Sequence, residues 1–269
     1  MNIERIIGSS LRMIKDSPRT VLPQFINWIP VLLFFAIVIQ FVRNLEALGI
    51  DATVMDETMI ESSMPILFDA VRLYMPLVFL VCVILVFTSS FVQACYPELA
   101  RQYVYGKKID LTKAFELSGV RFLNLIATNI VLGLIIFALS ILLFVPIIIT
   151  PYFVIVSIIG LLILLAYTVP LSMVLLPVVV LEKQSIVGAI KRSYEITKNN
   201  KFNAWILFIM VFLLLMVYNG IVSLLIFVLT EPLGMYTFII DMFAAIFSFT
   251  FSLFVYTFFY FDILKEKKK

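Results

Sequence analysis

The chain has 269 residues, of which 63% are hydrophobic and 14% are charged, with a formal net charge of +3 at pH 7. A soluble domain carries about 45–50% apolar and about 25% charged residues, so this composition excludes an ordinary soluble fold and indicates a protein solvated by lipid. The sequence has no histidine, which excludes histidine-based acid–base catalysis, serine–histidine and cysteine–histidine nucleophile pairs, and imidazole metal sites.

Six apolar segments are each long enough to cross a bilayer, because a hydrocarbon core about 30 Å thick requires roughly 20 helical residues. The first is interpreted as a retained span, since it is longer than the apolar part of a signal peptide. The predicted spans are Leu22–Val42, Leu73–Val92, Phe122–Val145, Tyr152–Leu181, Ala204–Leu229 and Met235–Phe261. The expected fold class is all-α: a polytopic integral membrane helical bundle in a single membrane domain, residues 1–269.

Four prolines lie in or next to the third and fourth spans. Pro146 and Pro151 mark the predicted hairpin between these spans, since one helix over the whole apolar run would be far longer than a bilayer requires. Pro170 and Pro177 lie inside the fourth span. They predict a kink or an early exit there.

Basic residues are distributed unequally between the two sides of the predicted bundle. They gather before the first, third and fifth spans and in the C-terminal tail, and only Arg43 and Arg72 of the 20 fall on the other side. The loop Asn44–Ile66 has five acidic residues and no lysine or arginine. The positive-inside rule then predicts that both termini are cytoplasmic. We expect a multi-pass protein in the plasma membrane of a bacterium or archaeon.

Each basic segment that precedes an odd-numbered span contains a stretch with helical periodicity. The first stretch has five apolar residues on one face, namely Ile3, Ile6, Ile7, Leu11 and Ile14. The second begins at Asp110 and the third at Ser185, and each of these residues is predicted to cap a helix. We therefore predict three cytoplasmic interfacial amphipathic helices, each followed by a transmembrane hairpin, in a parallel threefold repeat with units 1–95, 106–181 and 182–264.

Two interpretations of these interfacial helices remain open. They are structural elbows that anchor the hairpins to anionic lipid, or they form a ring that docks a protein partner or binds lipid headgroups. The partners expected are membrane lipids and a protein at the cytoplasmic face, without nucleic acid. The candidate partner face consists of four basic residues: Arg12, Lys113, Lys191 and Arg192.

Three segments of the chain carry a family resemblance. They are Tyr-Gly-Lys-Lys-Ile-Asp-Leu-Thr-Lys-Ala-Phe (105–115), Val-Leu-Glu-Lys-Gln-Ser-Ile-Val-Gly-Ala-Ile-Lys-Arg-Ser-Tyr (180–194) and Phe-Phe-Tyr-Phe-Asp-Ile-Leu (258–264). With them the chain resembles a prokaryotic family of six-helix membrane proteins related to the membrane domain found beside some glycerophosphodiester phosphodiesterases. In members with a phosphodiesterase, an attached soluble domain with acidic and histidine residues performs catalysis. The resemblance therefore implies a stand-alone membrane domain without that activity.

Asp241 is the clearest ionisable residue inside a predicted span, and such residues are functional candidates. Its helical face also carries Ala245, Ser248 and Ser252, and small residues allow a neighbouring helix to approach closely. Asp241 either forms a hydrogen bond with a neighbour such as Asn219, or lines an internal cavity. The candidate intramembrane polar site therefore comprises Asp241, Asn219, Ser248 and Ser252.

The sequence shows no catalytic signature, glycine-rich phosphate loop or acidic cluster for magnesium, so we expect no enzyme activity, cofactor or metal. The first functional hypothesis is a non-enzymatic integral membrane protein that organises lipid or partner proteins at the cytoplasmic membrane face. The alternative is a small transporter or permease subunit with a polar intramembrane site near Asp241. A lipid-modifying enzyme is a third and weaker hypothesis, and the oligomeric state stays open.

Overall fold

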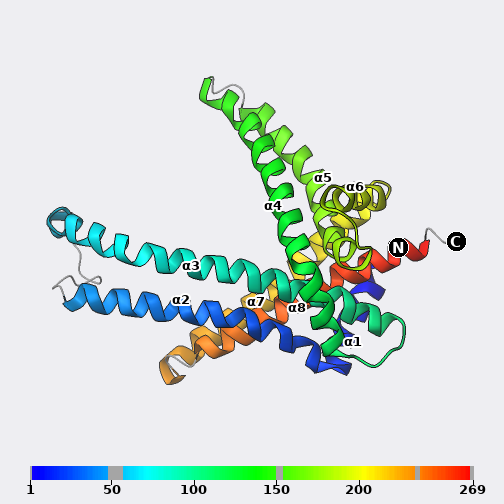
Figure 1. Ribbon diagram of the computed structural model, residues 1–269, viewed down its shortest axis with the longest axis horizontal. Helices are drawn as coiled ribbons and strands as arrows, with labels where there is room; N and C mark the ends of the chain where they lie inside the picture. Colours follow the sequence, from blue (N-terminus) through cyan, green and yellow to red (C-terminus); the bar gives the residue numbers. More distant parts are fainter. Residues whose placement is uncertain (1, 48–56, 150–153, 234–236, 267–269) are drawn as a thin grey trace. The chain divides into compact units, whose positions relative to one another are not determined.

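The computed structural model describes residues 2–47, 57–149, 154–233 and 237–266, and these residues form helices and no strands (Figure 1). The chain divides into two compact units, which we describe separately. Unit 1 comprises Met1–Gln24 and Ser90–Lys269, and unit 2 comprises Phe25–Ser89.

Eight α-helices and one 3₁₀ helix, η1, follow one another in the described residues. They are α1 (Ile3–Asp16), η1 (Pro18–Val21), α2 (Leu22–Ala47), α3 (Glu57–Val104), α4 (Leu111–Ile149), α5 (Val154–Leu181), α6 (Ile186–Thr197), α7 (Lys201–Leu233) and α8 (Thr237–Glu266). Six of them, α2, α3, α4, α5, α7 and α8, are long and apolar enough to cross a membrane. The prediction of six such helices is confirmed.

The helices extend beyond the predicted spans because the polar residues that flank an apolar segment can continue its helix. α3, for example, has 48 residues and continues into a polar stretch. The second predicted interfacial stretch is likewise not a separate helix. It forms the first turns of α4, since Asp110 caps the helix at Leu111 and no helix-breaking residue interrupts it before the apolar segment.

The prolines do not end the helices that contain them. α5 continues through Pro170 and Pro177 to Leu181, so the early exit is not observed. Pro146 lies within α4, and Pro151 lies outside the described residues. In lipid, a helix that opened fully at a proline would leave more backbone groups without partners than the proline itself does.

The third and fourth spans pair as predicted. α4 and α5 contact each other, and Ser157 Oγ donates a 2.5 Å hydrogen bond to the Leu143 carbonyl. Gly160 lies at this contact, where an added Cβ atom would meet the end of the Leu143 side chain. Small residues at such crossings are typical of helix packing in membranes.

Unit 2 consists of α2 from Phe25 onward and α3 up to Ser89. Tyr74 on α3 joins the two helices through an edge-to-face contact with Phe41, with ring centroids 5.3 Å apart. The Tyr74 hydroxyl also accepts a 2.5 Å hydrogen bond from Asn44 Nδ2. Most of the large apolar side chains in this unit are exposed, as expected for surfaces that face lipid.

Unit 1 is built around α8, which contacts α1, α5 and α7. Its buried side chains include Phe254, whose ring packs against that of Tyr96 on α3 with centroids 5.0 Å apart. The Tyr96 hydroxyl lies 3.2 Å from Thr250 Oγ1. The C-terminal part of α3 is therefore held on α8 by both aromatic packing and a buried hydrogen bond.

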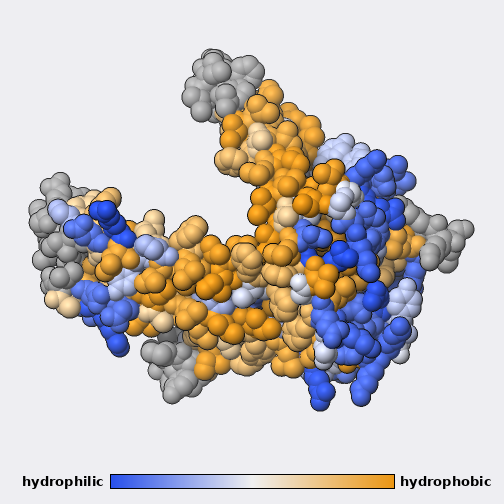
Figure 2. Space-filling view, in the orientation of Figure 1, coloured by the Kyte–Doolittle hydropathy of each residue, from blue (hydrophilic) through white to orange (hydrophobic). Residues whose placement is uncertain are grey.

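Hydrophilic residues gather at one end of unit 1. Figure 2 shows them over α1, α6 and the connection between α3 and α4, whereas the helices away from this end are covered by hydrophobic residues. The C-terminal end of α8 lies at the same end as α1 (Figure 1). We call this end of unit 1 the polar end.

Candidate functional site

The turn between α5 and α6 carries a polar residue that contacts several helices at the polar end. α5 ends at Leu181, and Lys183 adopts a left-handed conformation with φ of 55° that redirects the chain. Ser185 then caps α6, since its Oγ accepts a 3.3 Å hydrogen bond from the Gly188 amide. This confirms the predicted cap and leaves Glu182 between the end of one helix and the start of the next.

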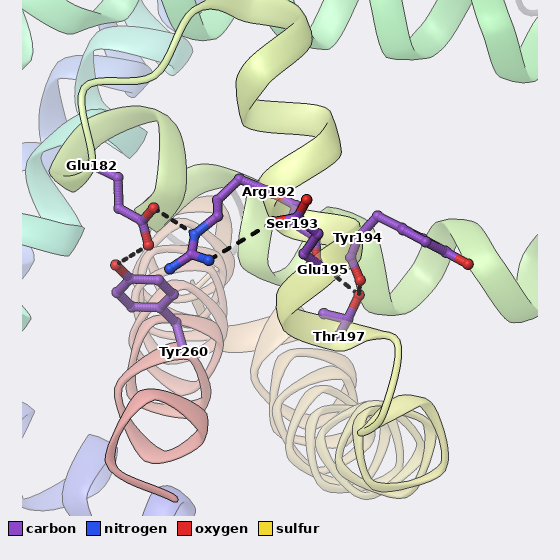
Figure 3. Close-up of polar contacts among 7 residues, drawn as sticks. All are labelled: Glu182, Arg192, Ser193, Tyr194, Glu195, Thr197 and Tyr260. Carbon is purple, nitrogen blue, oxygen red and sulfur yellow. Dashed lines mark hydrogen bonds and ion pairs between the residues drawn. The ribbon is translucent and has the colours of Figure 1, made fainter. Parts of the chain in front are cut away.

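Three helices of unit 1 meet at Glu182 (Figure 3). Arg192 Nε on α6 donates a 2.8 Å hydrogen bond to Glu182 Oε2, and the Tyr260 hydroxyl on α8 donates a 3.0 Å hydrogen bond to Oε1. Both carboxylate oxygens are thus occupied by donors from different helices. We call these three residues the Glu182 cluster.

The electrostatics of the cluster favour the charged state of Arg192. Its hydrogen bond with Glu182 raises the pKa of the guanidinium above the ordinary value, and the nearby charges of Glu182 and Glu195 act in the same direction. The Arg192 side chain is 37% exposed and that of Glu182 is 18% exposed. Partly exposed pairs of this kind contribute little to stability, so the cluster serves mainly to orient α6.

Cation–π contacts also hold α6 against its neighbours. The ammonium of Lys201, at the start of α7, lies 3.6 Å from the centroid of the Tyr167 ring on α5 and 5.5 Å from that of Tyr194 on α6. Cations over aromatic faces are attracted by the ring quadrupole. α6 is therefore fixed to α5, α7 and α8.

The four predicted partner-face residues all lie in helices of unit 1 but differ in their surroundings. Arg12 on α1 and Lys191 on α6 are exposed. Lys113, in the first turn of α4, lies 3.5 Å from Asp110, and Arg192 belongs to the Glu182 cluster. The exposed part of the predicted face is therefore best represented by Arg12 and Lys191.

The structure brings together part of the predicted intramembrane polar site. Ser248 Oγ on α8 lies 3.3 Å from Asn219 Oδ1 on α7 and donates to it. Ser252 Oγ instead donates to the Ser248 carbonyl. Asp241 is exposed, and no hydrogen bond or ion pair joins it to any residue that the structure describes. Asn219 therefore pairs with Ser248 and not with Asp241.

A cavity of about 300 Å³ lies beside Asn219, between α7 and α8. The other residues that line it are aromatic or aliphatic, and they are Phe208, Val211, Phe212, Leu215, Met216 and Tyr256. Asp241 is not among them. One amide and one tyrosine hydroxyl in a cavity that is mostly apolar offer little to a polar solute.

Glu182 and Tyr260 are the site residues that the sequence analysis did not select. Both lie within segments quoted for the family resemblance, Glu182 in 180–194 and Tyr260 in 258–264. The structure brings these two segments into contact. A search for polar residues at the ends of predicted spans would have selected both, but it could not have paired them.

Among the described residues, no group of three or more histidine, cysteine, aspartate or glutamate side chains is arranged to hold a metal ion. The chain matches no protein-family model, no curated protein and no solved structure. The family resemblance therefore stays a prediction.

Proposed function

We propose that the chain is a non-enzymatic integral membrane protein that organises lipid or partner proteins at the cytoplasmic membrane face. The observation that carries this proposal is the polar end of unit 1. There the Glu182 cluster holds α6 in place while the neighbouring residue Lys191 stays exposed. A surface that is held in place and keeps basic side chains such as Arg12 and Lys191 exposed is suited to binding anionic groups.

The orientation of this surface follows from the basic residues of the chain. With the polar end in the cytoplasm, α1, the start of α4 and α6 lie at the level of the lipid headgroups, and the three hairpins that follow them form a parallel repeat. α1 packs Ile6 and Met13 inside unit 1 and leaves Arg5 and Arg12 exposed. Its exposed face is therefore basic, as suits a surface next to anionic headgroups.

Native mass spectrometry of the protein extracted gently from its own membrane tests the proposal. We expect a retained protein or lipid, and we expect Arg12→Glu and Lys191→Glu to release it. Lys191 is a sharper probe than Arg192, because reversal of Arg192 would also break its 2.8 Å bond with Glu182. Arg43→Glu is the matched control, since Arg43 is exposed and belongs to unit 2.

If Arg43→Glu weakened retention of the bound lipid or protein as much as Arg12→Glu and Lys191→Glu do, a specific binding surface at the polar end would be contradicted. A protein that carries neither lipid nor protein would contradict the organising role itself.

The alternative function is a small transporter or permease subunit. The substitution Asp241→Asn distinguishes it from the organising role. A transporter that uses this carboxylate should lose flux in reconstituted vesicles, whereas an organising protein should keep its bound partners. Asp241 is exposed and forms no hydrogen bond with Asn219 or Ser248, so the described residues show no connected polar pathway. We therefore rank the organising role first.

A further inference from the structure

A polar cavity of about 960 Å³ lies in unit 1, apart from the Glu182 cluster. It is lined by η1 with the residues before it, by the last turns of α3, and by the connection from α3 to the first turn of α4. Pro18, which lines it, begins η1, and η1 leads directly into α2; Leu111, which also lines it, begins α4. The cavity therefore lies beside the starts of two helices that are long and apolar enough to cross a membrane.

The connection that forms one wall of the cavity has a fixed backbone. α3 ends in a Schellman motif, in which the Lys107 amide donates to the Gln102 carbonyl at 2.9 Å and the Gly106 amide donates to the Tyr103 carbonyl at 3.0 Å. Gly106 has a φ of 65°, a left-handed conformation that glycine adopts without strain.

Gln102 fixes the other end of the same connection. Its Oε1 accepts a 2.7 Å hydrogen bond from the Asp110 amide, and its Nε2 donates at 3.3 Å to the Asp110 carbonyl. Gln102 is 4% exposed, so these bonds are shielded from water. Lys107 and Lys108 consequently lie in a short loop that is held at both ends.

Two of the three carboxylates around the cavity are paired with cations: Glu98 with Arg101 at 2.6 Å, and Asp110 with Lys113 at 3.5 Å. The third, Asp16, accepts a hydrogen bond from the Tyr103 hydroxyl at 3.4 Å and keeps its charge. Glu98 and Asp110 therefore do not need the remaining cations as partners, and these cations outnumber Asp16.

Three cations at the cavity are left over. The side chains of Arg19, Lys107 and Lys108 are exposed and form no hydrogen bond or ion pair with the residues that the structure describes. Three cations that line one cavity give it a positive potential, which favours a bound anion.

The first turn of α4 adds hydrogen-bond donors to the same cavity. The Lys113 and Ala114 amides donate to Asp110. The Leu111 and Thr112 amides have no acceptor within the described ranges, and both residues line the cavity. Unpaired amides at a helix N-terminus, together with the helix dipole, favour a negative group.

We propose that this cavity binds the phosphate group of an anionic phospholipid, with Arg19, Lys107 and Lys108 as its cationic ligands and the Leu111 and Thr112 amides as donors. The inference rests on the proposed function and names its ligand class. Lipid is the favoured source of the phosphate because two membrane-crossing helices begin at the cavity, so a bound headgroup keeps its acyl chains in the bilayer.

The test is a lipid titration of the full chain in detergent micelles, followed by native mass spectrometry. The probes are phosphatidylglycerol, phosphatidylcholine with the same acyl chains, and glycerol phosphate. Each lysine near an anionic surface contributes about 1 kcal/mol, so we expect Lys107→Gln with Lys108→Gln to weaken phosphatidylglycerol binding about 10- to 30-fold. Arg19→Gln alone should weaken it about 5-fold.

A second double variant, Lys15→Gln with Lys198→Gln, is the matched control. It removes the same net charge from exposed residues of unit 1 that do not line the cavity, and we expect a change of less than about 2-fold. Melting temperatures and circular dichroism of all variants verify that each remains folded.

Equal loss in both double variants, or equal binding of phosphatidylcholine, would overturn the site. Binding of glycerol phosphate as tightly as phosphatidylglycerol would overturn a lipid as the source of the phosphate. The proposed function is tested separately, by whether Arg12→Glu and Lys191→Glu release the bound partner. Neither residue lines this cavity, so the two tests can fail independently.

Discussion

The hydroxyl of Tyr260 on α8 lies 3.0 Å from Oε1 of Glu182, although the two residues are 78 positions apart in the chain. This bond joins the last part of α8 to the turn between α5 and α6. Arg192 occupies the other carboxylate oxygen at 2.8 Å. The position of α6, and with it that of the exposed Lys191, therefore depends on a contact that α8 makes.

Replacing Tyr260 by phenylalanine removes this hydrogen bond and keeps the ring. We expect Tyr260→Phe to lower the free energy of unfolding by about 0.5–1 kcal/mol, because a half-buried carboxylate loses one of its two donors. Denaturant titration in micelles measures the change. Tyr256→Phe is the control, since the hydroxyl of Tyr256 has no hydrogen-bond partner among the described residues. Equal effects of the two substitutions would contradict the cluster.

Arg192 should contribute equally at neutral and moderately alkaline pH. Its pKa is raised above the ordinary arginine value, first by the hydrogen bond with Glu182. A raised pKa means stabilisation that is complete below the unfolded-state pKa and is lost as pH rises through the folded-state pKa. The unfolded-state pKa of arginine already lies far above pH 9, and the folded-state pKa lies higher still. The difference in melting temperature between Arg192→Gln and the unsubstituted chain should therefore be the same at about pH 7 and about pH 9, and a smaller difference at the higher pH would contradict this.

The same substitution at two glycines should have opposite effects on stability. Gly106→Ala should destabilise by about 1 kcal/mol, because alanine adopts the left-handed conformation poorly. Gly8→Ala, in the interior of α1, should stabilise by about 0.5–1 kcal/mol, since glycine disfavours a helix interior. A Cβ atom would have no neighbour within 4 Å at either position, so packing does not obscure the comparison. Destabilisation by both substitutions would contradict the backbone argument.

Lys183 occupies a left-handed conformation, with φ of 55°, without being glycine. Lys183→Gly should therefore raise the free energy of unfolding by about 1 kcal/mol, as measured by denaturant titration. Lys198→Gly is the matched control, because Lys198 has a φ of −51° in the ordinary helical region and glycine should destabilise there. A lower stability for Lys183→Gly would indicate that the lysine side chain itself matters at the turn.

The Asn219–Ser248 hydrogen bond predicts coupling between α7 and α8. A double-mutant cycle with Asn219→Leu and Ser248→Ala should give an interaction energy of about 0.6 kcal/mol, the average for such bonds in a membrane. The same cycle with Asn219→Leu and Asp241→Asn should give none, because the two side chains form no bond. If Asn219 were coupled to Asp241 and not to Ser248, the result would support the pairing of Asp241 with Asn219 that the sequence predicted.

Much of the architecture is readable from local sequence. The six membrane-crossing helices follow from the length and apolarity of each segment, and the caps at Asp110 and Ser185 follow from residue type and helical periodicity. These features depend on a few consecutive residues. The parallel repeat and the cytoplasmic orientation stay predictions, since they concern relations between segments or with the membrane.

The pairing of polar residues is decided by how the helices pack. Glu182 with Tyr260, Gln102 with Asp110, and Asn219 with Ser248 are contacts that composition and periodicity do not predict. A helix turns about 100° per residue, so a small rotation of one helix about its axis changes which side chain faces a neighbour. Apolar side chains in lipid gain little by one rotation over another. The rotation is therefore determined by the few interhelical hydrogen bonds and close contacts, which exist only once the helices have assembled.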